Sequence, residues 1–256
     1  SESRGLGDVY KRQIITSTGS PLAAESFEYV YKNLKKDVHL ASIAGGTDLV
    51  GCLVLGNLFS NVYKGEIQGQ SLGIDVDVFT DDGKSTKDNE KGELVVKKPF
   101  PSMPVKFWGD DGEKYHKAYF SKFKNVWHHG DFVERTSNNG FIVRGRSDAT
   151  LNPGGVRIGT SEIYQQVENI KFITEGLVVG QNYKDDIRII LFVTTKDNEE
   201  LDEEKVKSIK FKIRKNCSPK HVPSIIIRTP EIPRTKSGKI VELAVKKVIN
   251  GEELNN

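Results

Sequence analysis

The chain has 256 residues, 29% of them charged, and a formal net charge of +3 at pH 7. Such a small net charge gives no reason to expect a nucleic-acid partner, and no apolar run approaches the roughly 20 residues that a membrane-spanning helix needs. The two cysteines, Cys52 and Cys217, lie far apart without metal-ligand spacing, so we expect reduced thiols and a cytosolic protein.

The start of the chain differs in character from the rest. It begins with SESRGLGDVYKRQ instead of methionine, and the single methionine is Met103. We therefore expect a fragment of a longer protein. Residues 1–13 are interpreted as a possibly non-native leader, and no function is assigned to them.

Residues 14–147 are predicted to be rich in short strands. A helix is expected over 20–34, with Ser20 as its N-cap and Pro21 at its first position. Residues 38–48, VHLASIAGGTD, predict a buried strand that runs into a tight glycine turn.

Short strands with turn signals are expected later in this region. Alternating apolar and polar residues over 73–85 lead into an Asp-Asp-Gly turn, and the strand GELVVKKP follows. Residues 130–146 predict a hairpin, with Asn138, Asn139 and Gly140 at its turn.

Residues 148–256 predict a compact α+β domain of ordinary size. Strands are expected over 175–181, 187–195 and 223–230, and helices over 160–170, 202–217 and 240–250. The second helix places Val206, Ile209 and Ile213 on one face. The fold class is therefore α/β (α+β) as a whole.

Lysines and arginines gather between Lys205 and Lys247, where only Glu231 and Glu242 oppose them. This excess of positive charge would suit a polyanion such as a nucleotide, coenzyme A, RNA or a membrane surface. A solvated helix face with scattered lysines explains the same composition.

Four short segments are too polar for a core. STGSP (17–21) precedes a helix and could offer backbone N–H groups to a ligand, although a plain helix cap explains it as well. AGGTD (44–48) offers a hydroxyl and a carboxylate, which would suit a phosphate and Mg²⁺, or is only the end of a strand.

WHHGD (127–131) places an aspartate in a predicted tight turn, where its carboxylate could accept hydrogen bonds from two ribose hydroxyls. His128 and His129 do not predict a metal site, because adjacent residues seldom bind one ion without further ligands. PRTKSGK (233–239) puts Lys239 in an exposed loop that lacks the Walker A pattern, so a basic solvent loop is the alternative.

The order of these segments resembles the motif series of the adenylate-forming acyl-CoA synthetase superfamily, over nearly the whole chain after residue 13. The greatest likeness is to its acetoacetate-specific branch. The segments that carry this likeness are STGSPL, GGTD, VYKGEIQG, KPFPSMPVKFW, AYFSKF, WHHGDF, GRSDATLNPGGVRIGTSEIY and VELAVKKVINGE.

The resemblance implies a reaction in two steps. A carboxylate, here acetoacetate, attacks the α-phosphate of ATP to give an acyl-adenylate, and the thiol of coenzyme A then displaces AMP. Lys239 matches the lysine of the first step, whose charge would relieve the repulsion between carboxylate and phosphate.

The resemblance also implies the nucleotide site. Its residues would be Gly19, Ser20 and Pro21 beside the adenine, Thr47 beside the phosphate, Asp131 and Arg146 on the ribose, Arg157 at the phosphate end, and Asp48 as the Mg²⁺ ligand.

Asp148 matches the hinge of a small mobile C-terminal domain, residues 148–256, while 14–147 would be the C-terminal part of the large domain. Gly154 and Gly155 would line the channel for the arm of coenzyme A. The N-terminal portion of the family, including its phosphate loop and most of the acyl pocket, is missing from these residues, so we expect the isolated chain to be inactive.

Two alternatives stay open. The acid could be another short-chain acyl acid such as acetate, since the loop PRTKSGKI is closer to the general superfamily form than to the acetoacetate branch. The chain could also be a non-catalytic module that binds a nucleotide or coenzyme A.

Overall fold

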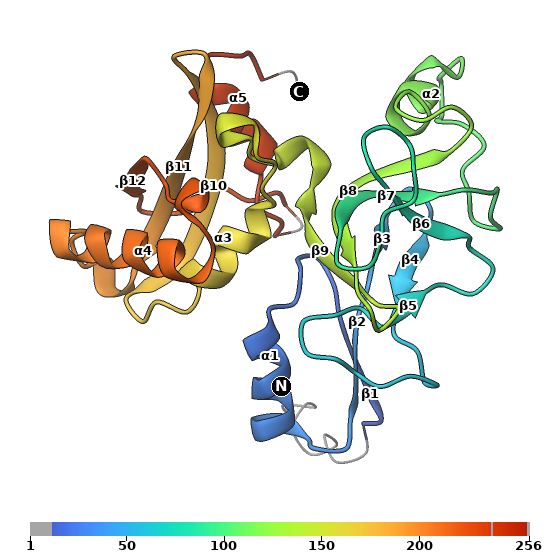
Figure 1. The fold of residues 1–256 in the computed structure, drawn as a ribbon, viewed down its shortest axis with the longest axis horizontal. Coiled ribbons are helices and arrows are strands. Elements are labelled where there is room, and N and C mark those ends of the chain that lie inside the picture. Colours follow the sequence, from blue (N-terminus) through green and yellow to red (C-terminus); the bar gives the residue numbers. More distant parts are fainter. Residues whose placement is uncertain (1–11, 237, 255–256) are drawn as a thin grey trace. The chain divides into compact units, whose positions relative to one another are not determined.

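The computed structural model describes residues 12–236 and 238–254, which form two compact units that divide between Val143 and Arg144. Figure 1 shows their helices and strands in chain order. The mixture of helices and strands confirms the predicted α/β class. Most of the predicted leader, residues 1–11, lies outside the described residues.

The first unit begins with a parallel pair of strands, β1 (Ile14–Ser17) and β2 (His39–Ser42). Parallel strands need a crossover connection, and it is supplied by α1 (Ala24–Tyr29) and the π-helix η2 (Val30–Leu34). The N–H of Ile43 donates to the Ser17 carbonyl at 2.9 Å, so the loops that follow the two strands start side by side.

The predicted start of the first helix is wrong. Ser20 is not its N-cap and Pro21 is not its first residue, because α1 starts at Ala24 and Ala23 is extended, with ψ 149°. A residue before proline disfavours the helical conformation, which keeps Ser20 out of the helix. The buried side chain of α1 is Phe27, so packing does not favour an earlier start either.

The next sheet corrects the expected glycine turn. Gly45 and Gly46 belong to β3 (Ala44–Gly46), which pairs with β4 (Gly51–Leu55), and β4 pairs with the short β5 (Gly69–Gln70). A Cβ on Gly45 would lie 2.2 Å from the Gly51 carbonyl oxygen. The glycine therefore serves close approach of two strands, and the turn begins at Thr47.

The largest sheet of this unit confirms the predicted short strands and the predicted hairpin over 130–146. Its strands stand in the order β6 (Val76–Phe79), β7 (Lys91–Val96), β8 (Trp127–Arg135) and β9 (Phe141–Arg146). The turn between β8 and β9 contains Asn139 at φ 60°, a conformation that asparagine tolerates.

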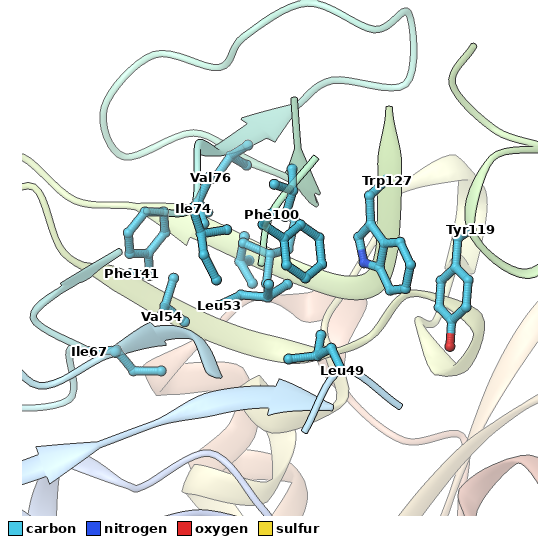
Figure 2. Packing of buried hydrophobic residues seen from close by; sticks show 14 residues of the cluster. Leu49, Leu53, Val54, Ile67, Ile74, Val76, Phe100, Tyr119, Trp127 and Phe141 are labelled. Atoms are coloured by element: carbon cyan, nitrogen blue, oxygen red, sulfur yellow. The ribbon is translucent and has the colours of Figure 1, made fainter. Parts of the chain in front are cut away.

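The core of the first unit packs aromatic side chains on this sheet (Figure 2). Tyr119, at the end of α2 (Glu113–Tyr119), stacks on Trp127 with ring centroids 3.7 Å apart. Phe100 meets the same indole edge to face at 5.6 Å. Leu53 and Leu94 belong to the same core and are fully buried.

The second unit is built on the sheet β10 (Ile173–Tyr183), β11 (Asp186–Thr195) and β12 (Ile225–Arg228), as predicted. β10 and β11 are antiparallel, whereas β11 and β12 are parallel. The remaining elements are η3 (Ser147–Ala149), η4 (Pro153–Gly155), α3 (Thr160–Val167), η5 (Lys196–Asn198), α4 (Glu203–Asn216), η6 (Pro219–His221) and α5 (Glu242–Ile249).

Alternation along β10 divides the core of this unit between two faces of the sheet. Val178 packs with α3 and α4, where Ile209 and Ile213 are fully buried as predicted and Val206 is half-buried. Leu177 and Val179 instead pack with Ile232, Ile240, Val245 and Ile249. α5 thus covers the face opposite to α3 and α4.

Tyr164 links α3 to α5 at the free edge of β10. Its hydroxyl donates to Glu242 Oε1 at 2.5 Å and accepts from the Val178 N–H at 3.1 Å. Burial raises the pKa of the Glu242 carboxyl, and the Asp148 carboxylate raises it further. Burial likewise raises the pKa of the Tyr164 phenol.

Among residues 12–236 and 238–254, no helix combines the length and apolar character that crossing a membrane requires. Both cysteines are free thiols, Cys52 in the first unit and Cys217 in the second.

The core of the first unit predicts the cost of a cavity. Leu94→Ala removes a fully buried side chain from β7 and is expected to lower the free energy of unfolding by about 2–5 kcal/mol. Urea unfolding, followed by the fluorescence of the buried Trp127, measures this loss. Leu72→Ala is the matched control, because Leu72 is 99% exposed. Equal losses in both variants would refute this description of the core.

The raised pKa of Glu242 predicts a pH-dependent stability of the second unit. Burial favours the protonated carboxyl in the folded chain, so its contribution is fully present below the unfolded value of about 4.3. It is lost as the pH rises through the higher folded-state pKa. In Glu242→Gln the side chain stays neutral and this loss is absent.

The slowest-exchanging amides of β10 and β11 report the free energy of unfolding of this unit. Between about pH 4 and pH 7 the unmodified chain should lose stability relative to Glu242→Gln. A constant difference between the two across this range would contradict the prediction.

Candidate functional site

The loops after β1 and β2 bring two of the polar segments to one edge of the first unit. Carboxyl ends of neighbouring parallel strands are a frequent ligand site. Gly19, at φ 96°, and the exposed Ser20 and Pro21 follow β1. Thr47 and Asp48, both exposed, stand in the turn after β3.

Asp131 does not lie in the predicted tight turn. It is a buried residue of β8, where the pairs Val95–His128 and Glu93–Phe132 leave extra residues on one strand. This is a β-bulge, and Gly130 supports it with φ 82°, which side chains other than glycine rarely adopt. The bulge turns the Asp131 carboxylate toward the imidazole of His129, whose Nε2 lies 3.6 Å from Oδ2.

His129 connects this bulge with the glycine strand. Its Nδ1 lies 3.4 Å from the indole N–H of Trp127, which donates to it. A Cβ on Gly46 would lie 3.0 Å from its Cε1, so β3 passes directly over the imidazole. The segments 44–48 and 127–131, far apart in sequence, therefore meet in the folded unit.

Tyr119 joins the same site from α2, since its hydroxyl donates to Asp48 Oδ2. Sequence reasoning gave no role to Tyr119 or to His129. For Tyr119 the AYFSKF segment gave a signal, but the pairing with Asp48 depends on the stacking of its ring on Trp127.

His128 points away from this site, to Glu93. Its Nε2 lies 2.8 Å from Glu93 Oε2, and the other carboxylate oxygen accepts from Lys122 Nζ at 2.7 Å. Glu93 is fully buried, so its ion pair with Lys122 is interpreted as structural. A charged residue inside the apolar run GELVV was its signal in the sequence.

The described ranges contain no group of three or more His, Cys, Asp or Glu side chains that could hold a metal ion. Asp48 is a single exposed carboxylate with one oxygen bonded to Tyr119. Mg²⁺ often takes one or two carboxylates together with substrate phosphates and waters. Asp48 fits such a ligand set as one member of it.

In the second unit, residues 145–159 hold several of the predicted site residues. Arg146 Nε lies 3.6 Å from Asp148 Oδ1, and the Asp148 carbonyl accepts from Lys246 Nζ at 3.0 Å. Arg157 folds back on this segment, because its Nε donates to Thr150 Oγ1 at 3.3 Å.

Gly154 and Gly155 lie in η4, with φ 57° and 77°. The Gly154 N–H donates to Asp186 Oδ1 at 2.8 Å, and a Cβ there would lie 2.2 Å from Lys220 Nζ. Gly155 lines a pocket of about 580 Å³ together with Asn152, Asn182, Tyr183, Lys184, Asp185, Asp186 and Ile187. The sequence analysis did not identify Asp186, because two aspartates in a hairpin turn, Asp185 and Asp186, give no local sign of a contact with η4.

Lys239 stands in an exposed loop before α5. An antiparallel bridge between Arg234 and Ile240 closes the loop, and the Thr235 N–H donates to the Lys239 carbonyl at 2.8 Å. The Lys239 side chain is exposed. Ser237, in the middle of the motif, lies outside the described residues.

The chain is similar to acetoacetyl-CoA synthetases over almost its full length. It is 56% identical to that of Rhizobium meliloti (strain 1021) over 250 residues, which are 97% of this chain and 38% of the relative. It is 49% identical to that of Gallus gallus over 243 residues, or 94% of this chain and 36% of the relative. No protein-family model matches the chain.

Solved structures give the same picture. An acetoacetyl-CoA synthetase from Streptomyces lividans matches with TM-score 0.84 and 39% identity over 92% of this chain and 36% of its own. A benzoate CoA ligase from Burkholderia xenovorans LB400 matches with TM-score 0.76 and 22% identity over 91% of this chain and 45% of its own, a likeness of fold alone.

The chain spans little more than a third of the length of the curated relatives that it matches, between 36% and 38% for the first two. Over that span, the sequence identity and the shared fold both indicate the same family. The chain thus belongs to the acetoacetyl-CoA synthetase family of adenylate-forming enzymes.

Proposed function

We propose that this chain works as the C-terminal part of a synthetase that ligates acetoacetate to coenzyme A and converts ATP to AMP and pyrophosphate. The observation that carries the proposal is the 56% identity to an acetoacetyl-CoA synthetase over 97% of the chain. All four polar segments lie within that span. The remaining part of the acyl site would come from the portion of the family that this chain does not include.

The first step needs an anion to approach an anion. A carboxylate oxygen of acetoacetate attacks the α-phosphorus of ATP, the bond to the β-phosphate oxygen breaks, and pyrophosphate leaves. Lys239 supplies a mobile positive charge on an exposed loop, which would bridge the two groups as they meet. Neutralising the crowded charge is the main task in phosphoryl and adenylyl transfer.

The first unit would hold the nucleotide. Asp131 offers a carboxylate that can accept hydrogen bonds from both ribose hydroxyls, and the bulge at Gly130 fixes its direction. Thr47 and the loop Gly19–Pro21 lie at the same edge, where they would meet phosphate and adenine. We assign Arg146 to the ribose and Arg157 to the phosphate end.

Asp48 would be the protein ligand of Mg²⁺. When bound, the ion would neutralise charge on the phosphates of ATP. Tyr119 would orient the carboxylate through its hydroxyl.

In the second step the sulfur of coenzyme A attacks the acyl carbonyl and AMP leaves. The absence of side chains at Gly154 and Gly155 would let the narrow arm of coenzyme A pass, beside the pocket that Gly155 lines. Asp148 would be the hinge about which the C-terminal domain, residues 148–256, reorients between the two steps. A cytosolic location completes the proposal, since two free thiols suit a reducing compartment.

Lys239→Ala separates the two steps. We use a chimera in which this chain replaces the segment that it matches in the Rhizobium meliloti relative. Acetoacetate-dependent exchange between ATP and pyrophosphate should fall about 100-fold or more, as expected for the loss of a charge that acts in the transition state. Thioester formation from preformed acetoacetyl-adenylate should stay within about threefold.

Lys236→Ala is the matched control, an exposed lysine of the same loop, and should leave both steps unchanged. Equal loss of both steps in Lys239→Ala would refute the assigned role. Acetate and other short acids, tested on the same chimera, decide whether acetoacetate is the preferred acid.

The isolated chain is expected to show no acetoacetate-dependent exchange of pyrophosphate into ATP, because most of the acyl pocket and the phosphate loop lie outside it. Incorporation of labelled pyrophosphate into ATP is the measurement, with the chimera as positive control. Exchange by the isolated chain above the rate without acetoacetate would contradict the expectation.

A further inference from the structure

Glu242 occupies a position that the proposed chemistry does not use. It is the first residue of α5 and follows closely on Lys239 in the chain. Its carboxylate is half-buried and accepts the Tyr164 hydroxyl at 2.5 Å. An acid in such a place needs partners, since burial of a carboxylate is unfavourable without them.

The groups that face Glu242 come from α3 and from residues 145–148, which are called the hinge segment because they contain the proposed hinge residue Asp148. On the hinge side they are Arg146, which attracts the carboxylate, and Asp148, which repels it. On the α3 side they are the Tyr164 and Thr160 hydroxyls, both hydrogen-bonded to Glu242. Thr160 also touches the hinge segment, because a Cβ on Gly145 would lie 2.7 Å from its Oγ1.

The same helix contacts the hinge segment a second time, one turn further on. Lys246 Nζ donates to the Asp148 carbonyl at 3.0 Å. Residues at positions i and i+4 share one face of a helix. Glu242 and Lys246 thus direct one face of α5 at residues 145–148.

The start of α5 also contacts the lysine loop, which is the loop between Arg234 and Ile240 that contains Lys239. Ile240 follows Lys239 and packs into the core with Val245 and Ile249 of α5. Ile240 also forms the bridge to Arg234 that closes the loop. The loop is therefore attached to the start of α5, and a displacement of that helix end would displace Lys239.

We infer that Glu242 is a positioning residue that couples the lysine loop to the hinge segment, residues 145–148. Its carboxylate holds the first turn of α5 against Tyr164, and Lys246 holds the next turn against the Asp148 carbonyl, so that the loop and the hinge segment keep a fixed relation within this unit. The functional meaning of the coupling rests on the proposed roles of Lys239 and Asp148. The coupling itself is a property of the second unit.

Hydrogen exchange of the chain alone tests the coupling without substrates. Glu242→Ala should speed amide exchange about tenfold both in residues 145–151 and in the segment 238–246, because the side chain that accepts the hydrogen bond from Tyr164 is lost. Glu242→Gln keeps an acceptor for Tyr164 and should restore slow exchange in the loop. Lys247→Ala, an exposed position on the same helix, should change neither segment.

Faster exchange in only one of the two segments, or in neither, would overturn the coupling. Should Glu242→Ala fail to fold, Tyr164→Phe replaces it, since that change removes the hydroxyl that donates to Glu242 and accepts from the Val178 N–H. Because no substrate is present, these outcomes are independent of the proposed reaction.

The chimera shows what the coupling does in catalysis. Glu242→Ala should lower the rate of adenylate formation about tenfold, with thioester formation from preformed adenylate changed less than about threefold. A residue with only a structural role would lower both steps together, and that result would overturn the positioning role. A chimera that is inactive without any substitution would instead reject the proposed function, and the exchange data would still decide the coupling.

Discussion

The backbones of Arg144 and Gly159 lie against each other, and the arrangement of the residues between them depends on this contact. A Cβ on Gly159 would lie 2.2 Å from the Arg144 carbonyl oxygen, so no other residue type fits there without a shift. The contact closes residues 145–158 into a loop at the start of α3. Within this loop, the bridge between Leu151 and Ile158, the hydrogen bond from the Gly154 N–H to Asp186 and the one from Lys246 to the Asp148 carbonyl hold the candidate residues further.

In the first unit, strands position the polar candidate residues. A parallel pair supplies the edge at which two polar loops start together, and a bulge in an antiparallel strand directs Asp131. The glycines of β3 let this strand pass close to β4 and over His129. Both units thus place polar groups by close backbone contacts, with the apolar packing of Trp127 and its neighbours keeping the strands in register.

Much of this could be predicted from the sequence, and each failure has a physical cause. Alternation and helical periodicity predicted the hairpin of β8 and β9, the strands β10 and β11 and the buried face of α4, because these patterns follow from which side chains are buried. The predicted start of α1 was wrong because Ala23 is extended and α1 begins only at Ala24. The predicted turn at Asp131 was wrong because a glycine next to polar residues has the same sequence pattern in a turn and in a bulge. Tyr119 and Glu242 could not be found, because their partners are distant in sequence and only packing brings them together.

The central claim is that these residues are one part of an adenylating ligase for acetoacetate. The most direct test is the chimera with the Rhizobium meliloti relative, supplied with ATP, Mg²⁺, coenzyme A and either acetoacetate or acetate. We expect acetoacetyl-CoA, AMP and pyrophosphate in equal amounts, with kcat/KM higher for acetoacetate than for acetate. A folded chimera that forms no AMP with acetoacetate, or that prefers acetate, would contradict the account.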